Sequence, residues 1–159
     1  MGRAAAAGLI ATALAAASTP AFAAGPFSGF AGTWKGGGTV SMTDGSRESI
    51  RCKARYKIGS DGRALAINVL CASDSYRVHI LSTVAVEGET LSGSWQETTR
   101  QLSGSLTGEI PAPDTYQASL QTVGGGLQLG ARTNGTQQAI TITSQGSDIA
   151  GASILLRKR

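Results

Sequence analysis

The segment RCKARYKIGSDGRALAINVLC, residues 51–71, limits the possible folds more than any other part of this chain. Apolar and polar residues alternate on both sides of the pair Asp61-Gly62. Strict alternation is typical of a β-strand with one buried face, and Asp-Gly is typical of a tight turn because both residues tolerate positive φ. The segment therefore predicts a β-hairpin with one apolar face and one polar face.

The two cysteines of the chain fit this hairpin. If Asp61 and Gly62 form a two-residue loop, Cys52 lies directly opposite Cys71 on the apolar face. A hydrogen-bonded cross-strand pair has a Cα separation of about 5.5 Å, which a disulfide can span. We therefore predict a Cys52–Cys71 disulfide, which would stabilise the fold by about 3 kcal/mol.

The same alternation recurs along the rest of the chain, between short clusters of turn residues, and no helical periodicity follows residue 23. Ten such strands in an open sheet would leave exposed edges and one uncovered face. We therefore predict an all-β fold, an antiparallel meander of 8–10 strands closed into a small barrel with one hairpin disulfide. The strand segments are 32–43, 46–58, 63–71, 75–86, 90–97, 102–110, 115–122, 127–133, 136–144 and 149–157.

Two further turns can be predicted in detail. A two-residue loop at Asp44-Gly45 would put the apolar residues of the flanking strands on opposite faces, so we predict an odd-length loop with Gly45 in the left-handed conformation. Asn134-Gly135 predicts a two-residue hairpin loop, with Leu129 opposite Ile140. Glycines also recur at inward positions of the predicted strands, as strongly coiled barrel strands require.

The first residues have the features of a secretory signal peptide. Arg3 precedes the apolar stretch 4–17, and Ala21-Phe22-Ala23 is a small-x-small cleavage pattern. We predict a signal peptide over 1–23, a flexible mature N-terminus over 24–31 and a single barrel domain over 32–159. The protein is then periplasmic or secreted, where a disulfide is stable, and no later apolar run is long enough for a transmembrane segment.

Charge is unevenly distributed along the chain, whose net charge is +4. Residues 24–86 have eight basic and four acidic side chains, whereas residues 87–156 have two basic and six acidic ones. The polar face of the first hairpin strand is a row of cations about 20 Å long. A surface of this kind either attracts polyanions or is an ordinary solvated face, and the sequence leaves both open. This basic patch comprises Lys35, Arg47, Arg51, Lys53, Arg55 and Lys57.

The phrase FAGTW contains Gly32-Thr33-Trp34 at the start of the first predicted strand. It resembles the Gly-x-Trp signature of the calycins, the superfamily of lipocalins, fatty-acid-binding proteins and avidins. The resemblance implies that Gly32 and Trp34 form the base of the barrel, with Arg157 from near the chain's end over the indole. It also implies an apolar ligand in the lumen. The chain also looks like small exported proteins of alphaproteobacteria and like small periplasmic barrel inhibitors of secreted proteases.

The predicted inward face supplies candidates for a ligand-binding lumen. These residues are mostly large and apolar or aromatic, but the sequence does not decide whether the lumen is filled or hollow. The lumen candidates are Met42, Tyr56, Ile67, Tyr76, Trp95 and Leu106.

Signals for catalysis are weak. The one histidine, His79, is predicted to point outward, and Ser73 and Asp74 near it have no nucleophile elbow. Glu97 and Glu109 lie one strand apart and could form a carboxylate pair, but the sequence favours ordinary strand-end residues. No spacing of metal ligands or cofactor motif is found. We therefore expect no catalytic residues, no metal, no cofactor and no enzyme activity.

These observations favour an exported, non-enzymatic binding protein that carries a small apolar ligand in the barrel interior. The alternative is a surface binder of a macromolecule through the basic patch. Its partner would be a polyanion such as lipopolysaccharide, or a secreted enzyme that it inhibits. The oligomeric state does not follow from the sequence.

Overall fold

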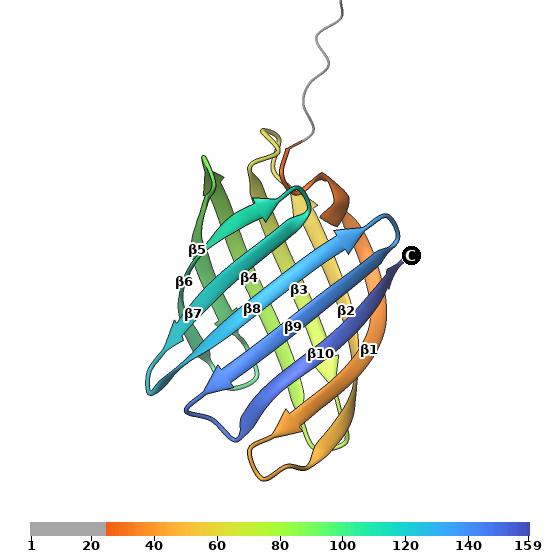
Figure 1. Ribbon diagram of the computed structural model, residues 1–159, viewed down its shortest axis with the longest axis vertical. Coiled ribbons are helices and arrows are strands. Elements are labelled where there is room, and N and C mark those ends of the chain that lie inside the picture. The colour runs from red at the N-terminus through yellow and green to blue at the C-terminus, as the bar shows by residue number, and fades with distance from the viewer. Residues whose placement is uncertain (1–24) are drawn as a thin grey trace, which may run out of the picture.

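A computed structural model describes residues 25–159, which form one short helix and ten strands (Figure 1). The predicted signal peptide, 1–23, lies outside the described residues. No helix within residues 25–159 is long and apolar enough to cross a membrane. The elements are η1 (Ser28–Phe30), β1 (Gly32–Met42), β2 (Arg47–Ile58), β3 (Ala64–Ala72), β4 (Arg77–Glu87), β5 (Thr90–Glu97), β6 (Leu102–Ala112), β7 (Thr115–Thr122), β8 (Gly125–Asn134), β9 (Gln137–Gln145) and β10 (Ile149–Lys158).

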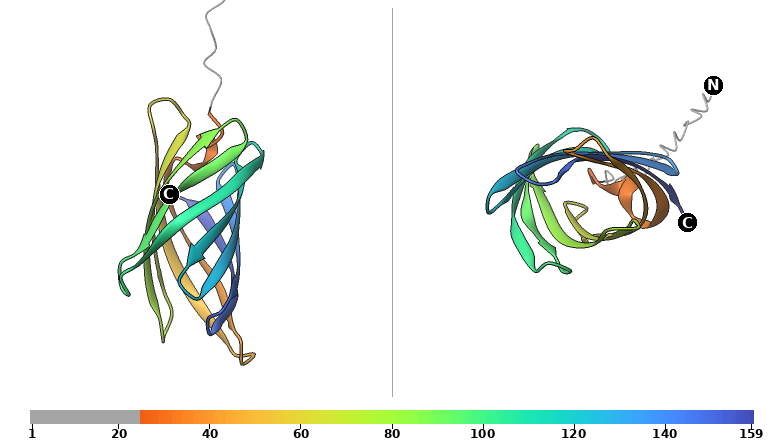
Figure 2. Two further views of the ribbon diagram at one scale, coloured as in Figure 1. Left: turned by 90° about the vertical axis from the view of Figure 1, so that its left-hand side faces the viewer. Right: turned by 90° about the horizontal axis from the view of Figure 1, so that it is seen from below.

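The strands form one closed antiparallel barrel. Each strand pairs with its neighbours in sequence, and β1 pairs with β10 to close the sheet (Figures 1 and 2). The prediction of an all-β meander closed into a barrel is confirmed, with ten strands. Closure leaves no unpaired strand edge, so every inward side chain faces a common interior.

The first hairpins agree closely with the sequence analysis. β1 and β2 are joined by the odd-length loop Thr43–Gly45, in which Gly45 has a φ of 87°. β2 and β3 pair in the predicted register, with Cys52 opposite Cys71 and a disulfide between them. Their Cα atoms are 4.1 Å apart, close to the spacing of a non-hydrogen-bonded pair and shorter than the value predicted above.

Two loops differ from the prediction. Gly62 N–H donates a hydrogen bond to the Gly59 carbonyl, so the β2–β3 loop is wider than the two residues predicted. Between β8 and β9, Leu129 lies opposite Ile142 and not opposite Ile140. The reason is that Gly135, with a φ of 58°, takes the first central position of its turn, which moves the pairing by two residues.

Some inward glycines are explained by the curvature of the wall. A Cβ atom at Gly38 of β1 would lie 1.8 Å from the Ser153 carbonyl oxygen on β10. At Gly108 of β6 it would lie 2.0 Å from the Gln117 carbonyl oxygen on β7. A neighbouring backbone therefore occupies the place of a side chain at both positions. These glycines allow strands to coil tightly and do not by themselves create a hollow lumen.

The segment before β1 plugs one end of the barrel. Phe27 and Phe30 are fully buried, and the Phe30 ring centroid lies 5.7 Å from that of Tyr56 on β2 and 5.3 Å from that of Tyr116 on β7. Gly29 N–H donates to the Asp114 carboxylate in the β6–β7 turn, at 2.7 Å. Residues 24–31 are predicted to be a flexible segment before the barrel, but Phe27 and Phe30 within it belong to the core. We call this the plugged end and the opposite end the far end.

Candidate functional site

The plugged end is built around Trp34. Its indole N–H donates to the Phe30 carbonyl at 2.8 Å, and the ring is fully buried. Lys158 lies over the ring, with its Nζ 5.3 Å from the ring centroid. The resemblance suggested Arg157 for this role, but Trp34 pairs with Lys158, so Arg157 points outward beside Lys35. Gly32, at the start of β1, is exposed and has a φ of 113°.

A buried polar chain crosses the interior next to this plug. The Tyr56 hydroxyl donates to Gln138 Oε1 at 2.9 Å, and Gln138 Nε2 donates to the Thr133 hydroxyl at 3.2 Å. Burial raises the pKa of the Tyr56 phenol well above its ordinary value, so the phenol stays protonated and donates. Both side-chain polar atoms of Gln138 form a hydrogen bond. These contacts link β2, β8 and β9 across the interior.

The far half of the interior contains half-buried apolar side chains beside buried ones such as Val40 and Ile50. These half-buried side chains point into the barrel, so the surface they expose faces the interior. They come from β1, β3, β7, β8, β9 and β10. The members of this lumen ring are Met42, Val69, Leu120, Leu129, Ile142, Ile149 and Ala152.

Trp95 on β5 lies among these side chains. Its ring packs over Gly104 of β6, where an added Cβ would lie 3.0 Å from Trp95 Nε1. The indole N–H is buried and has no hydrogen-bond partner within residues 25–159. A buried donor without an acceptor is costly, and it is a position where a ligand or a water is expected to accept a hydrogen bond.

Five of the six lumen candidates from the sequence share one apolar core, in which Tyr56, Trp95 and Leu106 are buried and against which Met42 and Ile67 pack. Tyr56 and Ile67 lie directly opposite each other on β2 and β3, toward the plugged end, whereas Met42 ends β1 and Trp95 lies near the end of β5, toward the far end. Leu106 is buried on β6. Tyr76 lies in the turn before β4 and not in the strand, with the Arg100 guanidinium 5.9 Å from its ring centroid.

Glu97 ends β5 at the rim of the far end, and its carboxylate is buried. It accepts hydrogen bonds from the backbone N–H groups of His79, Thr99 and Arg100 and from the Thr99 hydroxyl. Burial would raise the pKa of Glu97, but these donors outweigh it and lower the pKa to about 2. The carboxylate is therefore ionised and fully occupied in holding the β5–β6 turn.

The structure does not join the catalytic candidates into a site. Glu109 is exposed on the outer face of β6, so Glu97 and Glu109 lie on opposite sides of the wall. The His79 ring contacts Asn68 and Thr98, whereas the Ser73 hydroxyl accepts from the Tyr76 backbone N–H. Among residues 25–159, no group of three or more His, Cys, Asp or Glu side chains could hold a metal ion.

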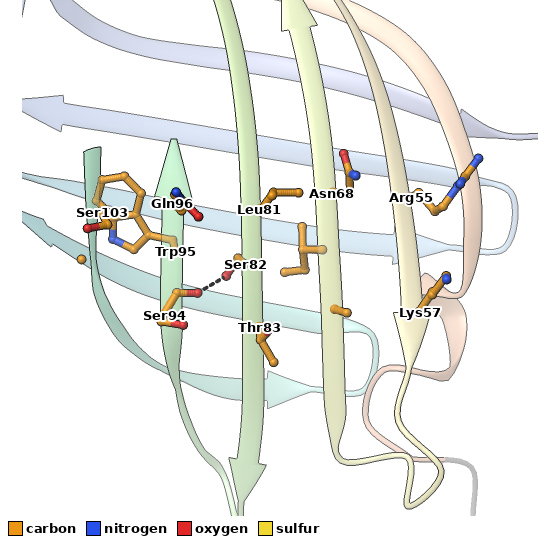
Figure 3. A pocket seen from close by; sticks show the side chains of 13 residues that line it. Arg55, Lys57, Asn68, Leu81, Ser82, Thr83, Ser94, Trp95, Gln96 and Ser103 are labelled. Carbon is orange, nitrogen blue, oxygen red and sulfur yellow. Dashed lines mark hydrogen bonds between the residues drawn. The ribbon is translucent and has the colours of Figure 1, made fainter. Parts of the chain in front are cut away.

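The basic patch lies on the outer face of β1 and β2, and all six of its side chains are exposed. Two open hollows adjoin it. One, of about 890 Å³, runs across β2 to β6 with Arg55 and Lys57 at one end and Trp95 and Ser103 at the other (Figure 3). The other, of about 520 Å³, includes Arg47 in its lining.

Sequence reasoning missed the residues that close the plugged end: Phe27, Phe30, Thr133, Gln138 and Lys158. Two phenylalanines three residues apart, in a segment otherwise made of small residues, were the available signal for a buried plug. Nothing local marked Gln138 as an interior residue. Its partner Tyr56 is 82 positions away.

No protein-family model and no curated protein matches the sequence. The fold is similar to that of the S-type phycobiliprotein lyase CPES from Guillardia theta. The TM-score is 0.59 at 8% sequence identity, over 82% of this chain and 88% of that chain. The similarity shows that the two chains share a closed β-barrel fold.

This comparison corrects the expectation that the chain is not an enzyme. A chain with the same barrel fold is named a lyase, and most of both chains is covered by the match. A small barrel without a familiar catalytic motif is therefore no argument against enzyme activity.

Proposed function

We propose that the protein binds a small, mainly apolar ligand in the far half of the barrel interior. The observation that supports this most directly is the lumen ring, a set of half-buried apolar side chains that point inward from β1, β3, β7, β8, β9 and β10. Covering such side chains with an apolar ligand removes their remaining surface from water, which is favourable. The barrel is of a kind compatible with ligand binding in its interior.

Trp95 suggests one polar feature of this ligand. Its buried indole N–H lacks an acceptor within residues 25–159, so a ligand that presents an oxygen there would satisfy it. Such a hydrogen bond would orient the ligand with its polar end toward β5 and β6. A fatty acid or fatty alcohol has the required combination of one oxygen-bearing end and an apolar chain.

Export and domain organisation belong to the same proposal. We propose that residues 1–23 are removed and that the remaining chain is a single barrel domain in the periplasm or outside the cell. The Cys52–Cys71 disulfide supports this, because disulfides persist mainly in oxidising compartments.

Fluorescence of N-phenylnaphthylamine, a neutral apolar probe, tests the interior site. The probe should brighten on binding, and it should be displaced by both a fatty acid and an alkane of the same chain length. Trp95→Phe should weaken displacement by the fatty acid about fivefold and leave displacement by the alkane unchanged.

Trp34→Phe is the matched control, because the Trp34 indole already donates to Phe30. It removes an indole from the plugged end and should leave the selectivity between acid and alkane as in the unmodified protein. No brightening of the probe would refute the interior site. Equal weakening in both tryptophan variants would refute the role of Trp95. Circular dichroism confirms that each variant is folded.

A further inference from the structure

Barrel closure brings cations from distant parts of the sequence together. Lys35 on β1 lies directly opposite Lys53 on β2 and, on its other side, directly opposite Arg157 on β10. Directly opposed side chains in an antiparallel pair are close neighbours, and like charges there destabilise a sheet. The fold therefore keeps this arrangement at a cost in stability. We define the basic face as Lys35, Arg51, Lys53, Arg55, Lys57 and Arg157.

Within residues 25–159, no cation of the basic face forms an ion pair with a carboxylate. Within the part of the chain that the structure describes, the ion pair present joins Arg100 and Glu97 in the β5–β6 turn. The acidic residues of the second half are carried mainly by other strands and turns. A surface with this uncompensated positive field attracts anionic partners.

Exposed leucines lie between and beside these cations. Leu70 is directly opposite Lys53, and Leu155 is opposite Gly37, which is in turn opposite Arg51. Leu155 is 65% exposed and Leu70 is 43% exposed. Leu81 follows on β4, in the same cross-strand row as Arg55 (Figure 3). Leu70 and Leu81 are diagonal neighbours on β3 and β4, and Leu155 lies on β10, on the other side of the cations of β1 and β2.

Cations combined with exposed leucines match the surface of an anionic lipid bilayer. Lysine and arginine bind the phosphates of the head groups, and leucine side chains enter the boundary between head groups and acyl chains. The hollow of about 890 Å³ beside Arg55, Lys57 and Leu81 offers additional room for a head group. We propose that the basic face is a docking surface for an anionic membrane.

A nucleic acid fits this face less well. Binding to single strands normally uses exposed aromatic side chains on which bases stack. Here the phenylalanine, tryptophan and tyrosine side chains of residues 25–159 are in the core, apart from the half-buried Tyr76 at the far rim. A soluble polyanion would also give no role to Leu155, which is exposed beside the cations.

Co-sedimentation of the full chain with lipid vesicles tests the proposal. Binding is expected to vesicles of phosphatidylcholine that contain phosphatidylglycerol, and not to vesicles of phosphatidylcholine alone. The double variant Lys35→Gln/Lys53→Gln should bind the anionic vesicles about 25-fold more weakly, since each cation near such a surface contributes about fivefold. Arg132→Gln is the matched control, because this exposed cation lies on β8, outside the basic face.

Binding of the double variant as tight as that of the control would overturn the proposal, as would equal binding to both kinds of vesicle. Leu155→Gln distinguishes a membrane from a soluble polyanion. It should weaken vesicle binding about fivefold and leave retention on a heparin column unchanged. If Leu155→Gln changes neither measurement while the lysine variant weakens both, the partner is a soluble polyanion and the membrane proposal is refuted.

Discussion

At the scale of single residues, Glu97 shows how a polar group is kept at the rim of an apolar interior. Its carboxylate is buried, but three backbone N–H groups and a hydroxyl donate to it. Charge-assisted hydrogen bonds of this kind are stronger than neutral ones. The residue therefore stabilises the β5–β6 turn.

The lowered pKa of Glu97 gives a prediction about stability and pH. The folded pKa is about 2, below the ordinary value of 4.5, so the ionised carboxylate stabilises the fold above pH 4.5 and this contribution is lost as the pH falls toward 2. Glu97→Gln should lower the free energy of unfolding at neutral pH by about 2 kcal/mol. It should also reduce the dependence of stability on pH over that range.

Urea unfolding at neutral pH and at several acidic pH values measures both effects. Glu109→Gln is the control, since Glu109 is exposed on the outer face of β6. An identical pH dependence in the Glu97 variant and the unmodified protein would contradict the assignment.

At the scale of elements, the strands differ in whether they tolerate a side chain. On β1, the place of a Cβ at Gly38 is occupied by the Ser153 carbonyl oxygen of β10. On β8, a Cβ at Gly126 would have its nearest neighbour 3.7 Å away, at the Leu120 carbonyl oxygen. The tight β1–β10 seam is what allows the meander to close.

Gly38→Ala should lower the free energy of unfolding by about 2 kcal/mol, because the methyl group must push two backbones apart. Gly126→Ala makes the same chemical change. It should leave the free energy of unfolding unchanged or raise it slightly, because alanine reduces the conformational entropy of the unfolded chain. Thermal and urea unfolding of the pair provide the comparison. Equal stability of the two variants would show that the β1–β10 seam can relax freely.

At the scale of the whole molecule, the two ends of the barrel have different characters. The plugged end is sealed by η1, the Trp34 indole and the Tyr56–Gln138 hydrogen bond, whereas the far half exposes apolar side chains to the interior. In Figure 1 the plug lies at the top of the barrel, on the same side as the C-terminus. A ligand entering the interior would therefore enter from the far end.

Phe30→Ala tests how much the plug contributes to the whole fold. Removing this fully buried ring, which contacts Tyr56 and Tyr116, should lower the free energy of unfolding by about 4 kcal/mol. Val123→Ala, in the exposed β7–β8 turn, should change it by less than about 0.5 kcal/mol. Urea unfolding followed by circular dichroism measures the difference, and a small loss for Phe30→Ala would mean that η1 is peripheral to the core.

Features that depend on neighbours in sequence could be predicted. Alternation determined which residues of each strand share a face, and the hairpin around Asp61-Gly62 placed Cys52 opposite Cys71. The mismatch of faces around Gly45 predicted an odd-length loop. The prediction at Asn134-Gly135 was wrong by two residues. Gly135 can take either central position of a two-residue turn, and both registers put the same side chains on the same face of the sheet.

The sequence by itself therefore determined the strands, their faces and the disulfide, because each follows from a period of two and a local turn. Only the tertiary structure decided which distant groups meet. It placed Lys158 and not Arg157 over Trp34, brought Phe30 to Tyr116, and set Arg157 beside Lys35. These contacts depend on the register at which β10 closes on β1 and on how the chain before β1 folds back. Both are set by the packing of the whole interior, which no short pattern encodes.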